Sequence, residues 1–330
     1  MYSIIAYAFS AVSELSKYEK MNRIPIVFAF DENMIVAAGV CMTSLLLNAD
    51  KETFYDIYVL HKGQSGLSGS KLQELPEYYR NCRISFLSVG DEYAGSYQVR
   101  GITDAAYYRL LAAEMLPEID KFLYSDVDVI FREDQNKFYE PDLKDCCFAS
   151  VNSVPVMNTD YLQYINSIGL DPKNGYYYAG NLVVNAAKIR NDGLTQVFLS
   201  HKDKKYRFMD MDIINLSCTG SFMPLPPAFC MTVDFYEAIT KERERLRKYY
   251  SDEEMDYALK QGIVHYNGAK PWNTVCPNMD IWWDYYRKSI FFDEKFTRDF
   301  WYNQTYRVEQ MSLWKRIKLV GRFFRKGGRR

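Results

Sequence analysis

The sequence lacks the marks of several protein classes. It holds only three histidines, its seven cysteines never occur in a CxxC spacing, and it contains no run of 18 apolar residues. The cysteine pattern argues against a structural zinc site, and the absence of a long apolar run argues against a membrane-spanning helix. An odd number of scattered cysteines is typical of a reducing compartment, so we expect a cytoplasmic protein.

What the chain does have is length and apolar content. It has 330 residues, of which 48% are hydrophobic, and it includes 28 tyrosines and 20 phenylalanines. A chain of this size can bury a large core, so folding requires no disulfide bonds. We expect one large domain with an extension.

Charge is distributed unevenly along the chain. The net charge is −1, yet residues 312–330 carry eight Lys or Arg and no acid, which leaves −9 on residues 1–311. An acidic body with a basic tail indicates that the tail has a partner of its own.

The tail interleaves its basic residues with apolar ones, namely Trp314, Ile317, Leu319, Val320, Phe323 and Phe324. This pattern is typical of a segment that lies on an anionic membrane surface, so we expect peripheral attachment to the inner face of the membrane. A solvated, disordered tail is the simpler alternative. We expect no nucleic-acid partner, because the body is acidic.

The first residues form a separate N-terminal segment, 1–23. It has an apolar patch but no basic region ahead of it, which argues against a secretory signal. A short amphipathic helix and an alternative start codon are both compatible with this segment.

From residue 24 onward, short apolar runs alternate with helical stretches. Strands are predicted at 24–30, 54–60, 83–89 and 121–124, and helices at 35–48, 68–75 and 103–115. We expect Pro76 to end the second of these helices and Thr103 to cap the third. The alternation is typical of an α/β fold with a mostly parallel, doubly wound sheet, in which ligands bind outside the carboxyl ends of the strands.

The second half is less regular. The sequence predicts a strand at 182–184, a helix at 210–217, a loop at 224–229 where three prolines occur, and aromatic-rich helices after residue 276. We therefore divide the chain into the N-terminal segment, a main domain at 24–275, and an extension at 276–330 that ends in the basic tail.

Asp126 and Asp128 stand two residues apart at the end of an apolar strand, in the sequence SDVDV. In an extended chain this spacing puts both side chains on one face, where two like charges are costly unless a cation neutralises them. Carboxylate oxygens suit hard divalent cations such as Mg²⁺ or Mn²⁺. For an isolated motif this short, a pair of solvated loop acids is the commoner explanation.

Two further segments favour the metal interpretation. Residues 31–33 (DEN) follow the first strand, where a doubly wound sheet binds ligands, although an Asx turn explains them equally well. The segment HYNGAKPW begins at His265, whose imidazole can complete a carboxylate metal site. In the same segment, Lys270 could neutralise a phosphate and Gly268 would allow close approach of the backbone.

Together these segments resemble the family 8 retaining glycosyltransferases, which include bacterial lipopolysaccharide galactosyl- and glucosyltransferases and the glycogenins. The resemblance covers residues 24–273 and is carried, in the family's order, by IVFAFDEN, AAYYRLLAAEMLP, FLYSDVDVIF, YYAGNLVVN, DMDIIN and HYNGAKPW. It implies a GT-A-type, Rossmann-like α/β fold with a helical C-terminal extension, and it makes residues 24–275 the GT-A catalytic domain.

The resemblance also implies roles for individual residues. Asp126, Asp128 and His265 match the metal ligands, and Asp210 matches an acid that touches the donor sugar and takes part in catalysis. Residues that match contacts to the nucleotide-sugar donor are Ala29, Asp31 and Asn33 for the uridine, and Arg109, Asp126, Val127, Asp128, Gly268 and Lys270 for the diphosphate side. The cation expected is Mn²⁺, with Mg²⁺ as the alternative.

Three positions and one spacing depart from the family pattern. Met34 stands where an aromatic residue usually stacks on uracil, Tyr178 replaces an asparagine before Ala-Gly, and Met211 replaces the amide of a DQD segment. The spacing between Gly268 and Lys270 is one residue shorter than usual. These changes indicate a different donor sugar or acceptor.

The function implied is transfer of a hexose, with galactose or glucose favoured, from a UDP-sugar to a glycan or lipid-linked glycan acceptor, in the synthesis of lipopolysaccharide or another surface polysaccharide. Two alternatives stay open. One is a nucleotide-sugar hydrolase on the same fold, and the other is a degenerate UDP-sugar-binding protein that turns nothing over.

Overall fold

The computed structural model describes residues 21–63, 66–99 and 103–318, together with residue 321. Most of the predicted N-terminal segment lies outside the described residues. So do four apolar residues of the predicted interfacial tail, namely Leu319, Val320, Phe323 and Phe324.

The strands of this described part form two sheets. The larger has seven strands in the order β3-β2-β1-β4-β7-β6-β8, and the smaller has three in the order β5-β10-β9. The strands are β1 Asn22–Ala29, β2 Thr53–Lys62, β3 Cys82–Val89, β4 Lys121–Ser125, β5 Val129–Phe131, β6 Phe148–Ser150, β7 Asn181–Asn185, β8 Phe222–Pro224, β9 Met231–Thr232 and β10 Ile263–His265.

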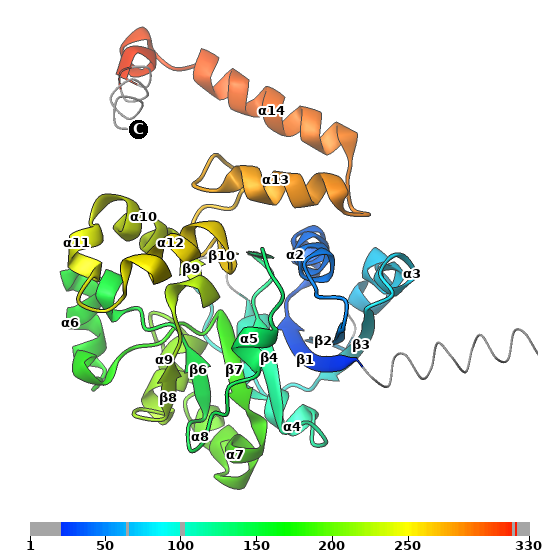
Figure 1. Cartoon of the computed structure of the whole chain (residues 1–330), viewed down its shortest axis with the longest axis vertical. Helices are drawn as coiled ribbons and strands as arrows, with labels where there is room; N and C mark the ends of the chain where they lie inside the picture. The colour runs from blue at the N-terminus through cyan, green and yellow to red at the C-terminus, as the bar shows by residue number, and fades with distance from the viewer. Residues whose placement is uncertain (1–20, 64–65, 100–102, 319–320, 322–330) are drawn as a thin grey trace, which may run out of the picture.

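Helices cover both faces of the larger sheet and form the C-terminal part (Figure 1). The α-helices are α2 Ile35–Leu47, α3 Leu75–Tyr78, α4 Ala112–Met115, α5 Asn136–Tyr139, α6 Thr159–Ser167, α7 Ala186–Asn191, α8 Leu194–Ser200, α9 Asp210–Ser217, α10 Val233–Lys241, α11 Arg243–Leu246, α12 Asp252–Lys260, α13 Met279–Lys288 and α14 Glu294–Glu309. The 3-10 helices are η1 Glu32–Met34, η2 Gly66–Gly69, η3 Lys71–Glu74, η4 Asp104–Leu110, η5 Val154–Val156, η6 Pro172–Asn174 and η7 Pro227–Phe229.

The order of the strands creates a switch point between β1 and β4. Strand β1 pairs in parallel with both β2 and β4, so the chain winds outward to β3 on one side and then crosses to the other side of β1. Beyond β4 the sheet becomes mixed, because β7 is antiparallel to both β4 and β6. The predicted doubly wound, mostly parallel sheet is confirmed, and its switch point is where such sheets bind ligands.

Strand β1 shows how the sheet separates two cores. Ile24, Ile26 and Phe28 point into a core that includes α2, whereas Val27 and Ala29 point into a second core that includes η4, α7 and α9. Neighbouring residues of a strand face opposite sides of a sheet, so an unbroken apolar run indicates a strand covered on both faces.

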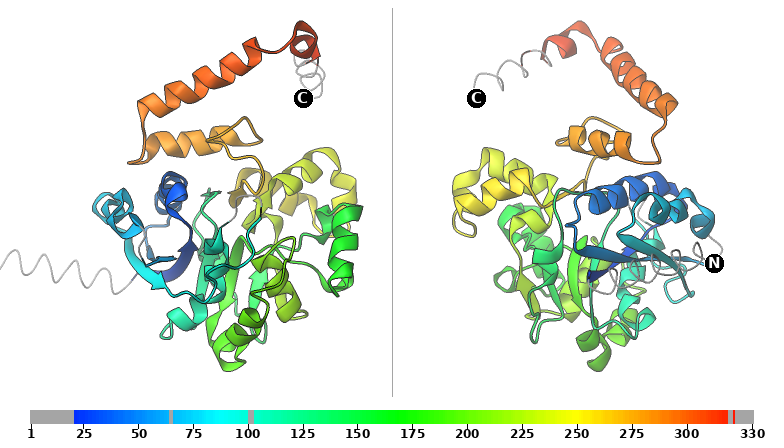
Figure 2. Two further views of the ribbon diagram at one scale, coloured as in Figure 1. Left: turned by 180° about the vertical axis from the view of Figure 1, so that it is seen from behind. Right: turned by 45° about the vertical axis from the view of Figure 1, so that its right-hand side comes forward.

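Helix α13 belongs to the first of these cores. Its side chains Trp282, Trp283 and Tyr286 are buried there. Just beyond it, the ring of Phe291 packs so closely on α2 that a Cβ atom at Gly39 would lie 2.2 Å from the ring. Helix α14 lies outside α13 (Figures 1 and 2), and Phe300 is its one buried side chain.

Several predicted elements differ from the observed ones. Pro76 does not end a helix but lies in the first turn of α3, where its missing N–H costs no helical hydrogen bond. The helix predicted at 103–115 is mostly the 3-10 helix η4, followed by one turn of α4. The loop predicted at 224–229 contains η7, and Pro224 ends the edge strand β8.

The remaining predictions fit the observed elements within a few residues. The strands expected at 24–30 and 83–89 are β1 and β3, and the helix expected at 210–217 is α9. Among the described helices, none combines the length and the apolar composition needed to cross a membrane.

Gly262, in the turn before β10, allows a test of the packing of this fold. Gly262 and Gly220 have the same φ of +79°, but a Cβ atom at Gly262 would lie 2.0 Å from the carbonyl oxygen of Ala228, whereas one at Gly220 meets no atom within 4 Å. Alanine at Gly220 should cost about 1 kcal/mol of unfolding free energy, and alanine at Gly262 about 3 kcal/mol or more. Thermal and urea unfolding of both variants measure this difference, and equal losses would contradict the packing described.

Candidate active site

The chain leaves β4 at the switch point and passes through the segment Asp126-Val127-Asp128 before it enters β5. The amide of Asp126 donates a 2.7 Å hydrogen bond to the carbonyl oxygen of Gly180, which fixes the start of this segment. The side chain of Val127 is buried in the core, so only its backbone is available to a ligand. The two aspartates lie on either side of this buried residue, as the spacing predicts.

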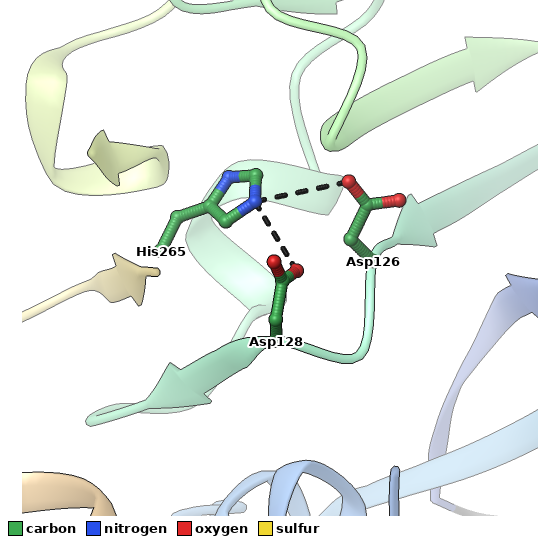
Figure 3. A group of neighbouring side chains, drawn as sticks. All are labelled: Asp126, Asp128 and His265. Carbon is green, nitrogen blue, oxygen red and sulfur yellow. Dashed lines mark ion pairs between the residues drawn. The ribbon is translucent and has the colours of Figure 1, made fainter. Parts of the chain in front are cut away.

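His265 reaches the same place through the smaller sheet. Strand β10 pairs antiparallel to β5, with His265 opposite Val129, and the amide of Tyr266 donates a 2.9 Å hydrogen bond to the carbonyl oxygen of Asp128. Nε2 of His265 is 3.2 Å from Oδ1 of Asp128 and 3.7 Å from Oδ2 of Asp126. Figure 3 shows the three side chains converging from three separate strand ends.

This cluster has the chemistry of a divalent-cation site. One ligand atom from each of the three side chains lies within 4.8 Å of the others. Two carboxylates and an imidazole suit Mn²⁺ or Mg²⁺. The space beside them depends on Gly180, because a Cβ atom there would lie 2.3 Å from Cε1 of His265 and 2.8 Å from Oδ2 of Asp126.

Lys270 supplies a further positive charge to this cluster. Its ammonium group pairs with Oδ2 of Asp128 and donates a 2.7 Å hydrogen bond to the carbonyl oxygen of Tyr266. Burial alone would raise the pKa of Asp128, but the charges of His265 and Lys270 hold that pKa well below its usual range. Burial likewise opposes the charge on His265, yet Asp128 raises the His265 pKa to about 10.

Arg109 joins this cluster to Asp210. It is buried in η4, and its guanidinium group is 2.7 Å from Oδ1 of Asp126 and 3.1 Å from Oδ2 of Asp210. The same group lies 4.3 Å from the centre of the Tyr124 ring and donates a hydrogen bond to the carbonyl oxygen of Ala179. The structure therefore brings three of the predicted site residues into direct contact.

Asp210 is the first residue of α9, and its side chain is almost fully buried. Burial raises its pKa to about 7, although the charge of Arg109 opposes this shift. An acid with this pKa changes charge near neutral pH, which is uncommon for a carboxyl group and typical of functional sites.

The residues predicted to bind uridine lie at the carboxyl end of β1. Ala29 is its last residue, and Asp31 caps η1 by accepting a 2.9 Å hydrogen bond from the amide of Asn33. The Asx turn considered from the sequence is therefore present. Thr103 stands at the N-cap of η4, but its hydroxyl does not cap that helix as predicted; it donates a 3.0 Å hydrogen bond to Oδ2 of Asp31 instead.

Gly268 is exposed, and a Cβ atom at this position would meet nothing within 4 Å. The protein itself therefore gives no steric reason for glycine here. Its predicted contact with a diphosphate stays a prediction.

The three residues that depart from the family pattern, Met34, Tyr178 and Met211, are packed against other parts of the protein. Met34 packs against the core that contains α2, and Met211 packs against the core on the opposite face. The hydroxyl of Tyr178 is 3.2 Å from Oγ1 of Thr232. Each side chain thus has a structural contact.

Sequence reasoning missed two neighbours of the predicted metal ligands. Gly180 lies within the AGN stretch, but nothing in a sequence shows that its missing side chain leaves room for Asp126 and His265. Cys230 is fully buried, and its Sγ is 3.4 Å from Nδ1 of His265, the ring nitrogen that faces away from the carboxylates. The second contact arises where Cys230, the residue before β9, lies beside β10, and no short motif indicates the pairing of these two strands.

The chain is similar to known proteins over most of its length. Residues 25–276 match the family model described as glycosyl transferase family 8. The chain is 24% identical over 256 residues to a lipopolysaccharide 1,2-glucosyltransferase of Escherichia coli strain K12, which covers 75% of this chain and 72% of that protein. It is 23% identical over 265 residues to a putative glycosyltransferase of Haemophilus influenzae, covering 77% and 74% respectively.

Among solved structures, the fold resembles that of the galactosyltransferase LgtC, determined in complex with donor and acceptor sugar analogues. The TM-score is 0.67 at 24% identity, and the match covers 83% of this chain and 99% of LgtC. This likeness supports the GT-A-type fold that the sequence predicts.

The site generates a prediction about pH. His265, with a pKa of about 10 in the metal-free protein, is protonated at neutral pH and must lose this proton to become a ligand. Binding of Mn²⁺ should therefore release a proton, and its Kd should fall roughly tenfold for each unit of pH gained between about pH 6 and 8. Titration calorimetry in two buffers of different ionisation enthalpy measures both quantities.

A variant with His265→Gln provides the control. It keeps both carboxylates but removes the titrating imidazole, so Mn²⁺ should bind weakly and with little dependence on pH. Asp210, with a pKa of about 7, also changes charge in this range. The pH dependence of the Mn²⁺ Kd that remains in the His265→Gln variant measures the contribution of Asp210. A wild-type Kd that does not change with pH would show that His265 is not a ligand.

Proposed function

The chain belongs to glycosyltransferase family 8, and from this premise we propose that it is a metal-dependent, retaining hexosyltransferase. The donor is a UDP-sugar, with galactose or glucose favoured, and the acceptor is a glycan or lipid-linked glycan of lipopolysaccharide or another surface polysaccharide. The observation that carries the proposal is the convergence of Asp126, Asp128 and His265, with Lys270 in direct contact with Asp128. The similarity to the lipopolysaccharide 1,2-glucosyltransferase supports the choice of acceptor class.

In this proposal Asp126, Asp128 and His265 hold Mn²⁺, with Mg²⁺ as the alternative. When bound, the cation neutralises negative charge on the departing diphosphate. Lys270 contributes to the same task, because its ammonium group already lies beside Asp128. Charges fixed before the reaction stabilise the transition state without a cost of reorganisation.

Asp210 and Arg109 act on the sugar side of the site. As the glycosidic bond weakens, positive charge develops on the sugar carbon, and the ionised Asp210 carboxylate stabilises it. Arg109 keeps this carboxylate close to Asp126 while offsetting the repulsion between the two acids. No protein nucleophile is required if the acceptor attacks from the face that the diphosphate leaves.

The remaining donor contacts are assigned by the resemblance. Ala29, Asp31 and Asn33 line the uridine pocket, and the backbones of Val127 and Gly268 approach the diphosphate. The adjacent carboxyl ends of β1 and β4 support this arrangement, because both segments emerge at the same edge of the sheet.

Two other functions compete with transfer. A nucleotide-sugar hydrolase would release free sugar without an acceptor, and a degenerate binding protein would bind UDP and metal without turnover. Met34, Tyr178 and Met211 motivate the second alternative. The Met211 thioether cannot make the hydrogen bonds of the amide it replaces, whereas the Met34 thioether can still pack on a ring. The charged groups of the site argue for a retained activity.

We further propose that the protein is cytoplasmic and attaches to the inner face of the membrane through residues 312–330. In the described part of this tail, Leu313, Trp314 and Ile317 are largely exposed. Leu313 and Ile317 stand four residues apart, so in a helix they are neighbours on one side. Basic residues at headgroup level and apolar residues below them suit an anionic bilayer.

A donor screen tests the catalytic proposal. Release of UDP from a panel of UDP-sugars is measured with Mn²⁺, with and without glycan acceptors, for the wild type and for Asp128→Asn. We expect acceptor-dependent release in the wild type and a loss of at least about 10³-fold in kcat for the variant, because a metal ligand is removed.

The exposed residue Asp203 offers a matched control, since Asp203→Asn makes the same chemical change in a surface turn. Circular dichroism checks that both variants stay folded. If Asp128→Asn turns over at the wild-type rate, the proposed role of the metal in the reaction is wrong. Release without an acceptor would identify a hydrolase, and binding without release would identify a degenerate protein.

Vesicle co-sedimentation tests the membrane proposal. Protein ending at residue 311 should bind vesicles with anionic lipid at least about tenfold more weakly than the full chain, because eight basic residues are lost. Trp314→Ser keeps every charge of the tail. Its weaker binding to the same vesicles therefore measures the contribution of an apolar side chain to membrane attachment. Equal binding by the full and shortened chains would eliminate the tail as the attachment site.

A further inference from the structure

The residue before Asp210 has an unusual backbone conformation. Met209 has φ 48° and ψ −119°, and its side chain is buried. L-amino acids other than glycine rarely adopt this conformation, and holding one there costs about 1–3 kcal/mol. Met209 is also the N-cap of α9, and no side chain caps the helix at this position. The turn therefore needs support from elsewhere.

Asp212, in the first turn of α9, makes contacts that can supply this support. Its Oδ2 accepts a 2.8 Å hydrogen bond from the amide of Phe208 and a 2.6 Å hydrogen bond from the hydroxyl of Tyr164. Its Oδ1 accepts a 2.5 Å hydrogen bond from the hydroxyl of Tyr176. The Tyr164 hydroxyl in turn accepts a 2.8 Å hydrogen bond from the amide of Arg207.

These contacts tie the turn to two other elements. Tyr164 lies in α6, and Tyr176 lies in the segment that leads into β7. A fully buried carboxylate is costly unless hydrogen bonds stabilise it, and those made to a charged oxygen are stronger than neutral ones. We call this group, Asp212 with Tyr164 and Tyr176, the tyrosine clamp.

The other side of the same turn faces the active site. Asp210 follows Met209 directly, and its carboxylate lies 3.1 Å from Arg109, which contacts Asp126 in turn. A change in the Met209 conformation would rotate the first turn of α9 and move Asp210 away from Arg109. We propose that the tyrosine clamp holds the strained turn at Met209 and thereby positions Asp210 against Arg109.

Asp212, Tyr164 and Tyr176 are accordingly positioning residues. Both oxygens of Asp212 already accept hydrogen bonds and its side chain is fully buried, so it does not act on the sugar itself. The inference rests on the proposed function for the catalytic role of Asp210. The clamp itself is testable without turnover.

Hydrogen exchange of the full-length protein, followed by mass spectrometry, tests the clamp directly. Tyr176→Phe removes one hydroxyl and leaves the ring, so we expect amides of residues 206–213 to exchange about tenfold faster. Tyr285→Phe is the control, because it also removes one hydroxyl, which in α13 accepts a hydrogen bond from the side-chain amide of Asn48. Tyr164→Phe serves as the second variant if Tyr176→Phe fails to fold.

Kinetics separate positioning from a structural role. With the donor found in the screen, Tyr176→Phe should lower kcat by about tenfold and change KM for the donor by less than about twofold, because Asp210 acts on the reacting sugar. Adding Met209→Gly should restore much of this loss, since glycine adopts the turn without strain.

The outcomes are distinct. If Tyr176→Phe behaves like Tyr285→Phe in exchange, or if exchange rises while kcat stays unchanged, the positioning role is overturned. If the wild type turns over no UDP-sugar, the proposed function fails, and faster exchange at residues 206–213 still supports the clamp. If Tyr176→Phe lowers kcat and the added Met209→Gly change does not restore it, the tyrosine clamp does not act by opposing strain at Met209, and the proposal fails.

Discussion

Compensation of buried negative charge at the switch point is the constraint on which the rest of the site depends. Asp126, Asp128 and Asp210 are brought together at one end of the sheet, and Arg109 and Lys270 pair with them. Without these cations the carboxylates would take up protons or separate. His265 adds a third positive charge while it keeps its proton, and it is the one that a metal ion can replace.

The same charged groups serve the proposed reaction. Asp126, Asp128 and His265 would hold the cation, which would supply positive charge to the same carboxylates. Lys270, which pairs with Asp128, would stabilise negative charge on the departing diphosphate beside it. Arg109 has less freedom, because it is buried and bonded to Ala179 as well as to both acids.

Much of this could be predicted because it is local. The apolar run of β1, the helix at 210–217 and the strand-end position of Asp126 follow from periodicity and composition, and the metal ligands and Asp210 were assigned by resemblance. Two predictions failed because of tertiary contacts: Thr103 contacts Asp31 instead of capping its helix, and Pro76 lies in the first turn of a helix instead of ending one. The hydrogen bonds of Asp212 could not be predicted, because they come from tyrosines far away in the sequence.

The extension bears on the site through packing. Helix α2 begins directly after η1, the turn that follows Asp31, and it is buried from Ala37 to Leu46. The outer side of α2 is covered by α13 and by the ring of Phe291, so the extension and the predicted uridine pocket meet the same helix. Residues 312–330 join this layer through α14, whose one buried side chain, Phe300, packs into the same core. If the tail attaches to a membrane as proposed, Phe300 is the contact through which the bilayer would orient the donor site.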